Sequence, residues 1–215
     1  MIILKVLLWI VVVLLIYRIL IGIVRKLLHF PAPGFISIFL DSRIRGWMQP
    51  PKDIIKFSGI QRGGKILEIG SGSGFFTLPS ARVVGQTGEI AALDVQQDML
   101  DKITIKLEKA ENKDIRNIRV VKASAYEIPY PAESFDVVFT VSVLQEIPKP
   151  HDALLEAYRV LKKDGIMSVS EFIPDPDWPL PGTVEKQLMA AGFKSIKRYG
   201  NLFRYTITGV KNDTT

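Results

Sequence analysis

A glycine-rich stretch at residues 67–74, LEIGSGSG, is the first place in this sequence where residue types and spacing suggest chemistry. Three glycines stand at alternate positions after a short apolar run, and such glycines let a backbone turn sharply and approach a ligand closely. A dinucleotide fingerprint is excluded because Phe75 stands where its third glycine belongs, and no Gly-Lys-Ser or Gly-Lys-Thr completes a P-loop. Glu68 would also repel a phosphate. A plain tight turn remains the alternative reading of the glycines alone.

A carboxylate one strand later sharpens this interpretation. Asp94 ends a second apolar segment and follows Gly70 by 24 residues. A carboxylate at that place in a parallel sheet can accept hydrogen bonds from both hydroxyls of a ribose. The loop and Asp94 together predict a pocket for a nucleoside without a phosphate site, whereas an exposed acid at a strand end is the simpler alternative.

Alternating apolar and amphipathic segments predict the elements that position these groups. Because strands separated by helices form parallel sheets, the pattern predicts a Rossmann-like α/β fold with helices on both faces of the sheet. The last two strands follow each other too closely for a crossover helix, so we expect them to pair antiparallel. We expect strands at residues 65–69, 89–94, 118–122, 135–141, 166–172 (after a turn at Asp164 and Gly165), 194–199 and 203–210, and helices at 75–84, 99–112, 151–161 and 184–191.

Composition and charge exclude several kinds of site. The 215 residues include no cysteine and only two histidines, so thiol chemistry is excluded and no metal site is expected. We expect His29 to lie at an interface and His151 to begin a helix. Of the 28 basic and 22 acidic residues, seven and one lie in residues 1–52, which leaves 21 of each sign in the remainder. A body without net charge speaks against a nucleic-acid partner.

The first quarter of the chain has the character of a membrane segment. Residues 6–24 are apolar apart from Arg18 and would form a helix of about 28 Å, close to the thickness of a bilayer core. Because more basic residues follow than precede it, we expect a single-pass transmembrane helix at residues 1–26 with the catalytic body in the cytoplasm. An interfacial helix and a cleaved signal peptide are the alternatives. An amphipathic connector is expected at residues 27–52, along the membrane, over the site or packed on the core, followed by the body at residues 53–215.

With these motifs in view, residues 50–210 resemble the class I S-adenosylmethionine-dependent methyltransferases, most of all the small-molecule group that includes quinone and phospholipid methyltransferases. The resemblance implies a seven-stranded, mostly parallel sheet with an antiparallel last strand, and S-adenosylmethionine as the cofactor. The motifs that carry it, in the family's order, are LEIGSGSG (67–74), ALDVQQDML (92–100), VKASAYEIPYPAESFDVVF (121–139), TVSVLQEI (140–147) and EAYRVLKKDGIMSVSEF (156–172).

The resemblance also implies which residues contact the cofactor. The glycine-rich loop would contact its methionine part, Asp94 its ribose and Val95 its adenine. Ser124 and Ala125 stand where the family usually has Asp-Ala, whose side chain faces the adenine amino group. The implied cofactor-binding residues are Glu68, Gly70, Ser71, Gly72, Gly74, Asp94, Val95, Ser124, Ala125 and Thr140.

The implied reaction needs few catalytic groups. The methyl group of a sulfonium is already activated, so in-line alignment and exclusion of water supply much of the rate. A base is required only where the acceptor must lose a proton. Glu171 is the first candidate because it lies at the end of the fifth strand. The next candidates are Gln145 and Glu146, which replace the histidine pair of many relatives, and Tyr126. For each candidate, a purely structural role is the alternative.

The acceptor is predicted from the surroundings of the pocket. The proline-rich loop at residues 173–183, with Trp178 and Leu180, is a candidate acceptor lid, or else a rigid surface loop. With the apolar connector it predicts a small hydrophobic acceptor such as a lipid or a quinone precursor. The leading hypothesis is a membrane-anchored methyltransferase. The alternative is a membrane-anchored module that binds the cofactor without turnover, and Phe75 disfavours a nicotinamide dehydrogenase.

Overall fold

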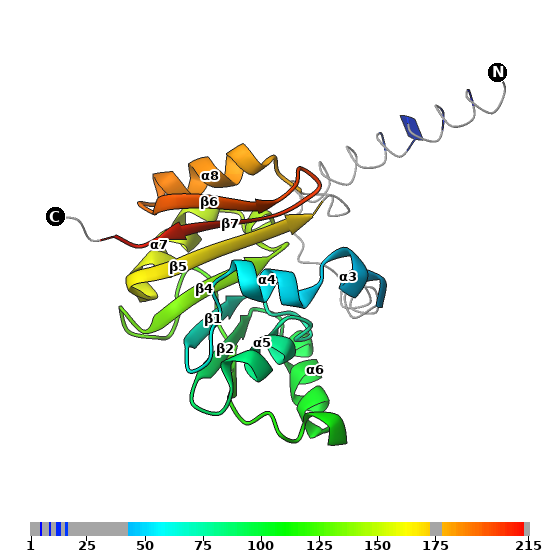
Figure 1. The fold of residues 1–215 in the computed structure, drawn as a ribbon, viewed down its shortest axis with the longest axis vertical. Coiled ribbons are helices and arrows are strands. Elements are labelled where there is room, and N and C mark those ends of the chain that lie inside the picture. The colour runs from blue at the N-terminus through cyan, green and yellow to red at the C-terminus, as the bar shows by residue number, and fades with distance from the viewer. Residues whose placement is uncertain are drawn as a thin grey trace.

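A seven-stranded sheet forms the centre of the computed structural model, which describes residues 43–172 and 178–212 and the isolated positions 5, 9, 12, 13 and 16. The sheet order is β3-β2-β1-β4-β5-β7-β6 (Figure 1). Strands β1 to β5 pair in parallel, and β7 lies antiparallel between β5 and β6. The expected Rossmann-like sheet with a reversed last strand is confirmed. The strands are β1 (Lys65–Ile69), β2 (Glu89–Asp94), β3 (Ile118–Lys122), β4 (Phe135–Val141), β5 (Leu161–Phe172), β6 (Lys194–Gly200) and β7 (Arg204–Val210).

Helices cover both faces of the sheet, as expected, and each layer encloses its own apolar core. Helices α4, α5 and α6 bury Ile54, Ala81 and Ile103 against one face, and α7 and α8 bury Leu154 and Leu188 against the other. The apolar stripes on one side of each helix account for this arrangement. The helices are α3 (Arg43–Met48), α4 (Pro51–Phe57), α5 (Thr77–Val84), α6 (Gln97–Glu108), α7 (Pro150–Val160) and α8 (Pro181–Ala190), with the short 3-10 helices η2 (Ala110–Asn112) and η3 (Leu144–Glu146).

The expected bounds of the first four strands agree with the structure, and the largest correction concerns β5. The turn predicted at Asp164 and Gly165 is instead an irregularity inside one long strand, which begins at Leu161. Asp164 has a positive φ of 61°, and its amide donates to the carbonyl of Lys211 at 2.9 Å. The amide of Lys211 in turn donates to the carbonyl of Gly165 at 2.9 Å. This long-range pairing keeps the segment in the sheet.

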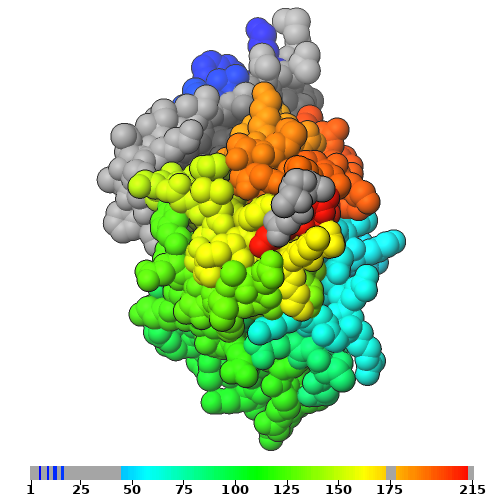
Figure 2. All heavy atoms as spheres, turned by 90° about the vertical axis from the view of Figure 1, so that its left-hand side faces the viewer, coloured from blue at the N-terminus to red at the C-terminus, as the bar shows by residue number. Residues whose placement is uncertain are grey.

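Helix ends differ by a few residues from those expected. Helix α6 begins at Gln97 and ends at Glu108, because η2 takes the last residues of the predicted segment. Helix α8 begins three residues early, at Pro181, where a proline is well accommodated in a first turn. Helix α7 begins at Pro150, so His151 lies in its first turn as predicted. The space-filling view shows the earlier segments, cyan and green, gathered in the lower half and the later segments, yellow to red, above them (Figure 2).

The predicted membrane segment lies largely outside the described residues. Of residues 1–26 the structure describes only positions 5, 9, 12, 13 and 16, and of the connector it describes residues 43–52. No helix among the residues that the structure describes is long and apolar enough to span a bilayer. Helix α4 continues from the predicted connector into the predicted body and buries Ile54 and Ile55 in the core.

Candidate functional site

The glycine-rich loop lies at the carboxyl edge of the sheet, between β1 and α5. Its first turn is fixed to the neighbouring strand, because the amides of Gly70 and Ser71 donate to the carbonyl of Leu93 at 2.8 and 3.0 Å. Gly70 has a φ of 71°, and a Cβ built there would lie 2.5 Å from Cγ1 of Val143. Only glycine satisfies both the backbone angle and this close approach of the β4–α7 connection.

Asp94 joins this loop to the end of β2. Its Oδ2 accepts a hydrogen bond of 2.9 Å from the amide of Gly72, and its Oδ1 accepts one of 2.9 Å from the amide of Gln96. The side chain is thereby oriented, and each carboxylate oxygen keeps a lone pair for a further donor. The next residue, Val95, is 54% exposed, so an apolar side chain stands open beside the oriented carboxylate. This pairing suits a ribose and an adjoining flat ring.

Glu68 is buried beneath the loop rather than displayed on it. It is 2% exposed, and the hydroxyl of Thr77 donates to its Oε2 at 2.5 Å. Burial raises the pKa of Glu68 to about 8, while the Thr77 hydrogen bond and the nearby charge of Arg45 lower it and the charge of Asp94 raises it further. The carboxyl group is therefore poised to change its protonation near neutral pH, and a cation entering the pocket would favour its ionised form.

Arg45 is the residue of this site that sequence reasoning missed. It lies on α3, is 7% exposed, and places its guanidinium carbon 5.3 and 5.0 Å from the ring centroids of Phe75 and Phe76. Its charge acts on Glu68 from this position. The available signal was an arginine inside an apolar segment, but nothing in its spacing indicated a partner 23 residues later.

Three hydroxyls line the same edge of the sheet without a protein partner. The Oγ atoms of Ser71 and Ser142 and the Oγ1 of Thr140 are buried and make no hydrogen bond within the described part of the chain. Thr140 is 1% exposed near the end of β4, and Ser142 follows that strand with a positive φ of 55°. Buried hydroxyls normally have partners, so polar atoms of a ligand are the natural candidates here.

Ser124 and Ala125 follow β3 on the far side of Asp94. The amide of Ala123 donates to the carbonyl of Asp94 at 3.2 Å, which holds this connection against the end of β2. The Oγ of Ser124 accepts a hydrogen bond of 3.2 Å from the amide of Tyr126. Ala125 is 8% exposed and packs into the core beside α7. Ser124 therefore lies near Asp94, with its hydroxyl engaged in a local turn.

The candidate bases do not converge on one point. Glu171 is 1% exposed and pairs across the sheet with Tyr205, whose pKa is raised by burial and by the charge of Glu171. Gln145 lies on η3, and its Nε2 donates to Oε1 of Gln187 on α8 at 3.0 Å. The Tyr126 hydroxyl instead accepts from the amide of Lys149 at 2.9 Å. Glu146 also lies on η3 and is partly buried.

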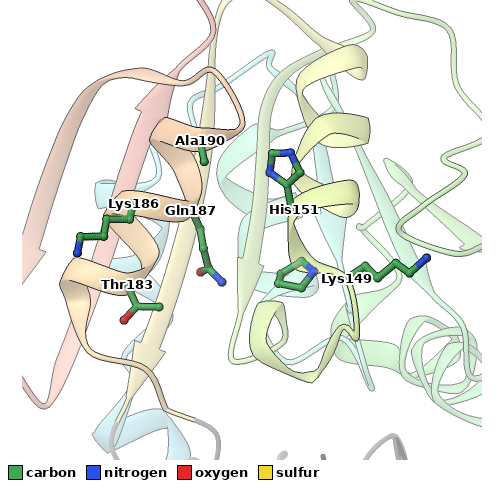
Figure 3. Close-up of a pocket in the computed structure, with 7 residues that line it drawn as sticks. Lys149, His151, Thr183, Lys186, Gln187 and Ala190 are labelled. Carbon is green, nitrogen blue, oxygen red and sulfur yellow. The ribbon is translucent and has the colours of Figure 1, made fainter.

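A hollow of about 460 Å³ lies between α7 and α8 (Figure 3). Gln187, the partner of Gln145, is one of its walls, but no predicted cofactor-binding residue lines it. The seven lining residues are Lys149, Pro150, His151, Thr183, Lys186, Gln187 and Ala190. We place the candidate site at the glycine loop and Asp94 because the oriented carboxylate and the unpartnered hydroxyls lie there. Within the described residues, no group of three or more acidic or histidine side chains could hold a metal ion.

Comparisons with known proteins identify a methyltransferase family over the segment that contains the glycine loop and Asp94. Residues 67–169 match the family model of a methyltransferase domain. The chain is 33% identical to the ubiquinone/menaquinone biosynthesis C-methyltransferase UbiE of Erwinia tasmaniensis over 149 residues, which are 69% of this chain and 57% of that protein. It is 32% identical to the demethylmenaquinone methyltransferase of Staphylococcus aureus (strain Newman) over 153 residues, 71% of this chain and 59% of the relative. The chain thus spans about half the length of the curated relatives that it matches.

Solved structures confirm the fold. A SAM-dependent methyltransferase from Aquifex aeolicus superimposes with a TM-score of 0.76 at 23% identity, covering 84% of this chain and 99% of that one. The [4+2]-cyclase SpnF, with a TM-score of 0.64 at 19% identity over 75% of this chain and 79% of its own, shows that the fold alone does not specify a reaction. The family match and the relatives make that distinction: they support an S-adenosylmethionine-dependent methyltransferase domain within this chain, with S-adenosylmethionine as its cofactor.

Proposed function

We propose that this protein transfers the methyl group of S-adenosylmethionine to a small hydrophobic acceptor, of which a quinone precursor is the first candidate. The observation that carries the proposal is the placement of Asp94, whose two oxygens are oriented by Gly72 and Gln96 at the end of β2. The names of the relatives, which describe C-methylation in quinone biosynthesis, support this acceptor class. The absence of a P-loop or dinucleotide fingerprint in the sequence supports a cofactor without a phosphate chain.

The residues of the pocket would bind and orient rather than react. S-adenosylmethionine supplies an activated methyl group on a cationic sulfur. Asp94 would accept from the ribose hydroxyls, and Val95 would cover the adenine. The carboxylates of Glu68 and Asp94 would favour a cation in the pocket, while the hydroxyls of Ser71 and Thr140 offer donors and acceptors to the polar part of the ligand.

Methylation of a ring carbon requires the loss of a proton from that carbon, so a base on the acceptor side has a role. We propose Glu171 for this role, because it lies at the carboxyl end of β5 on the face that Tyr205 and α8 enclose. Gln145 and Glu146 on η3 would position the acceptor from the next strand. The burial of Glu171 would keep water away from the proton transfer.

The membrane segment belongs to the same proposal. The apolar run at residues 6–24 supports a single-pass helix within residues 1–26, with the connector at 27–52 and the catalytic body at 53–215 on the cytoplasmic side. An anchor would concentrate the enzyme at the surface where a hydrophobic acceptor gathers.

The decisive experiment identifies the acceptor directly. The full chain is incubated with lipid and quinone extracts and with cofactor carrying a deuterated methyl group, and the extract is analysed by mass spectrometry. We expect a quinone-type product in which CD3 has replaced one hydrogen. The Asp94→Ala variant is the matched control and, at a cofactor concentration that does not saturate the parent chain, should label the extract several-fold less. A labelled polar product would refute the acceptor class and leave the transfer itself intact.

A binding module without turnover is the second candidate. The observation in its favour is that Gln145 is engaged by Gln187 on α8. Such a module would bind the cofactor in calorimetry but would label no molecule in the extract. An enzyme would bind the cofactor and also label its acceptor.

A further inference from the structure

Four large apolar side chains stand exposed at the carboxyl edge of the sheet. Trp47 of α3 is 82% exposed, Leu180 just before α8 is 60% exposed, and Leu202 and Phe203 of the β6–β7 turn are 52% and 59% exposed. We call these four residues the apolar rim. Side chains of this size expose considerable apolar area, and several together on one edge mark an interaction surface.

The rim residues come from three separate parts of the chain that the structure ties together. Nη1 of Arg204, next to Phe203, donates to the carbonyl of Met48, next to Trp47, at 2.8 Å. The hydroxyl of Tyr205 donates to the carbonyl of Pro179, next to Leu180, at 2.8 Å. In Figure 1 the end of β5, the β6–β7 turn and α3 lie toward the same side of the molecule.

Hydrogen bonds and an aromatic contact hold the β6–β7 turn, which carries two of the rim residues, in place. Oδ1 of Asn201 accepts from the amides of Phe203 and Arg204 at 2.9 and 3.0 Å, which closes the β6–β7 turn. Below the turn, Tyr199 stacks on Phe57 of α4 with ring centroids 4.9 Å apart. The turn therefore holds Leu202 and Phe203 outward and does not fold them into the core.

The charges around the apolar rim and the apolar segment that precedes α3 in the sequence indicate the kind of surface that the rim contacts. Lys52 and Lys56 of α4 are exposed close to α3, and Arg204 forms an ion pair of 3.8 Å with Asp53, so the two lysines give this edge its net positive charge. Only 18 residues separate the apolar run at residues 6–24 from Arg43 on this edge, a span of roughly 60 Å at full extension. Apolar side chains flanked by lysines, next in sequence to an apolar segment of membrane length, fit an anionic lipid surface.

We propose that the apolar rim inserts into the surface of an anionic lipid bilayer. Insertion would turn the carboxyl edge of the sheet, with Asp94 and the glycine loop, toward the membrane. Ile105 and Met189 are also exposed, but they lie near the C-terminal ends of α6 and α8, which lead away from this edge, and would remain in water. The proposal concerns orientation and does not depend on methyl transfer.

The absence of cysteine allows a clean test. Spin labels are attached to Phe203→Cys and, as a control, Ile105→Cys in the full chain, with vesicles of phosphatidylcholine and phosphatidylglycerol. We expect the ratio of oxygen to nickel-chelate accessibility to be severalfold higher at position 203 than at position 105. A second comparison places the label on Leu180→Cys, with and without serine at positions 47, 202 and 203. The ratio of oxygen to nickel-chelate accessibility at position 180 should fall when Trp47, Leu202 and Phe203 are all changed to serine.

Each other outcome overturns the proposal. Equal exposure of both labels to the nickel chelate, or failure of the chain to float with the vesicles, means that the rim does not meet lipid. Shielding of position 203 from both reagents means that protein covers the rim. Calorimetric titration of the labelled samples with S-adenosylmethionine separates these failures from failure of the cofactor site, because a folded pocket binds the cofactor whatever the rim contacts.

Discussion

The amide of Gly72 donates a hydrogen bond of 2.9 Å to Oδ2 of Asp94, so this carboxylate fixes the glycine loop to the end of β2. Changing Asp94 to Ala should weaken S-adenosylmethionine binding by about 1–3 kcal/mol, because the ribose hydrogen bonds and the orientation of the loop are both lost. Isothermal calorimetry measures the change, and Asp98→Ala in the first turn of α6 is the control. An unchanged affinity in a folded Asp94→Ala variant would remove the basis of the assignment.

Two glycines of the loop should respond differently to alanine. At Gly70 a Cβ would meet Val143 at 2.5 Å, so Gly70→Ala should be strongly destabilising and lower the unfolding midpoint. At Gly72 nothing lies within 4 Å, and the cost to folding should be about 1 kcal/mol from its φ of 53°. Because that open space faces the proposed ligand, Gly72→Ala should keep its fold and lose cofactor affinity. Thermal unfolding and calorimetry distinguish the two, and equal unfolding midpoints would contradict the packing argument.

The protonation of Glu68 should make stability depend on pH. Burial raises its pKa from 4.5 to about 8, so between those values the folded chain holds a proton that the unfolded chain releases. The unfolding free energy should therefore fall as pH rises from about 5 to 8, by up to about 1.4 kcal/mol per unit, and level off above pH 8. Urea unfolding at several pH values tests this. Glu68→Gln should abolish the slope, whereas Glu108→Gln, on the exposed end of α6, should retain it.

Arg45 should link cofactor binding to pH. Removal of its charge in Arg45→Met leaves the Glu68 carboxylate less stabilised, so the pKa of Glu68 should rise further. If a cationic cofactor binds best to the ionised carboxyl group, affinity at pH 7 should fall about 3- to 10-fold and recover toward higher pH. Arg45→Lys keeps the charge and should behave nearly as the parent. An identical pH profile for both variants would show that Arg45 acts through packing on Phe75 and Phe76 alone.

Glu171 is tested by separating binding from turnover. Glu171→Gln should leave S-adenosylmethionine affinity unchanged and slow methyl transfer to the extracted acceptor about 100-fold or more, the usual contribution of a general base. The same change should lower the pKa of Tyr205, since it removes a neighbouring negative charge. Glu185→Gln on α8 also removes a negative charge that raises the pKa of Tyr205, and it is therefore the matched control for turnover: it should keep full methyl transfer. Full turnover by Glu171→Gln would assign this carboxylate a structural role.

Strands bounded by clear breaks could be predicted from sequence, and contacts between distant segments could not. The bounds of β1, β2, β3 and β4 follow from apolar runs that end at glycine, acid or polar residues. The early start of β5 was missed because Asp164 and Gly165 read as a turn, and only their pairing with Lys211 keeps them in the sheet. Asp94 could be singled out from its distance to the glycine loop, and Glu68 from its place in the same motif. The burial of Glu68, which raises its pKa, could not be predicted from the sequence. The same is true of the position of Arg45, because both depend on packing between distant segments.

The position of β7 has a consequence for how this protein is made. The last strand in the sequence lies inside the sheet and pairs with both β5 and β6. During synthesis β5 therefore leaves the ribosome 31 residues ahead of β7, and until β7 follows, the open edge of β5 is a site for mispairing with other nascent chains. Loss of residues 204–210 would leave two unsatisfied strand edges in place of one finished sheet, so even a short premature stop should yield an insoluble product.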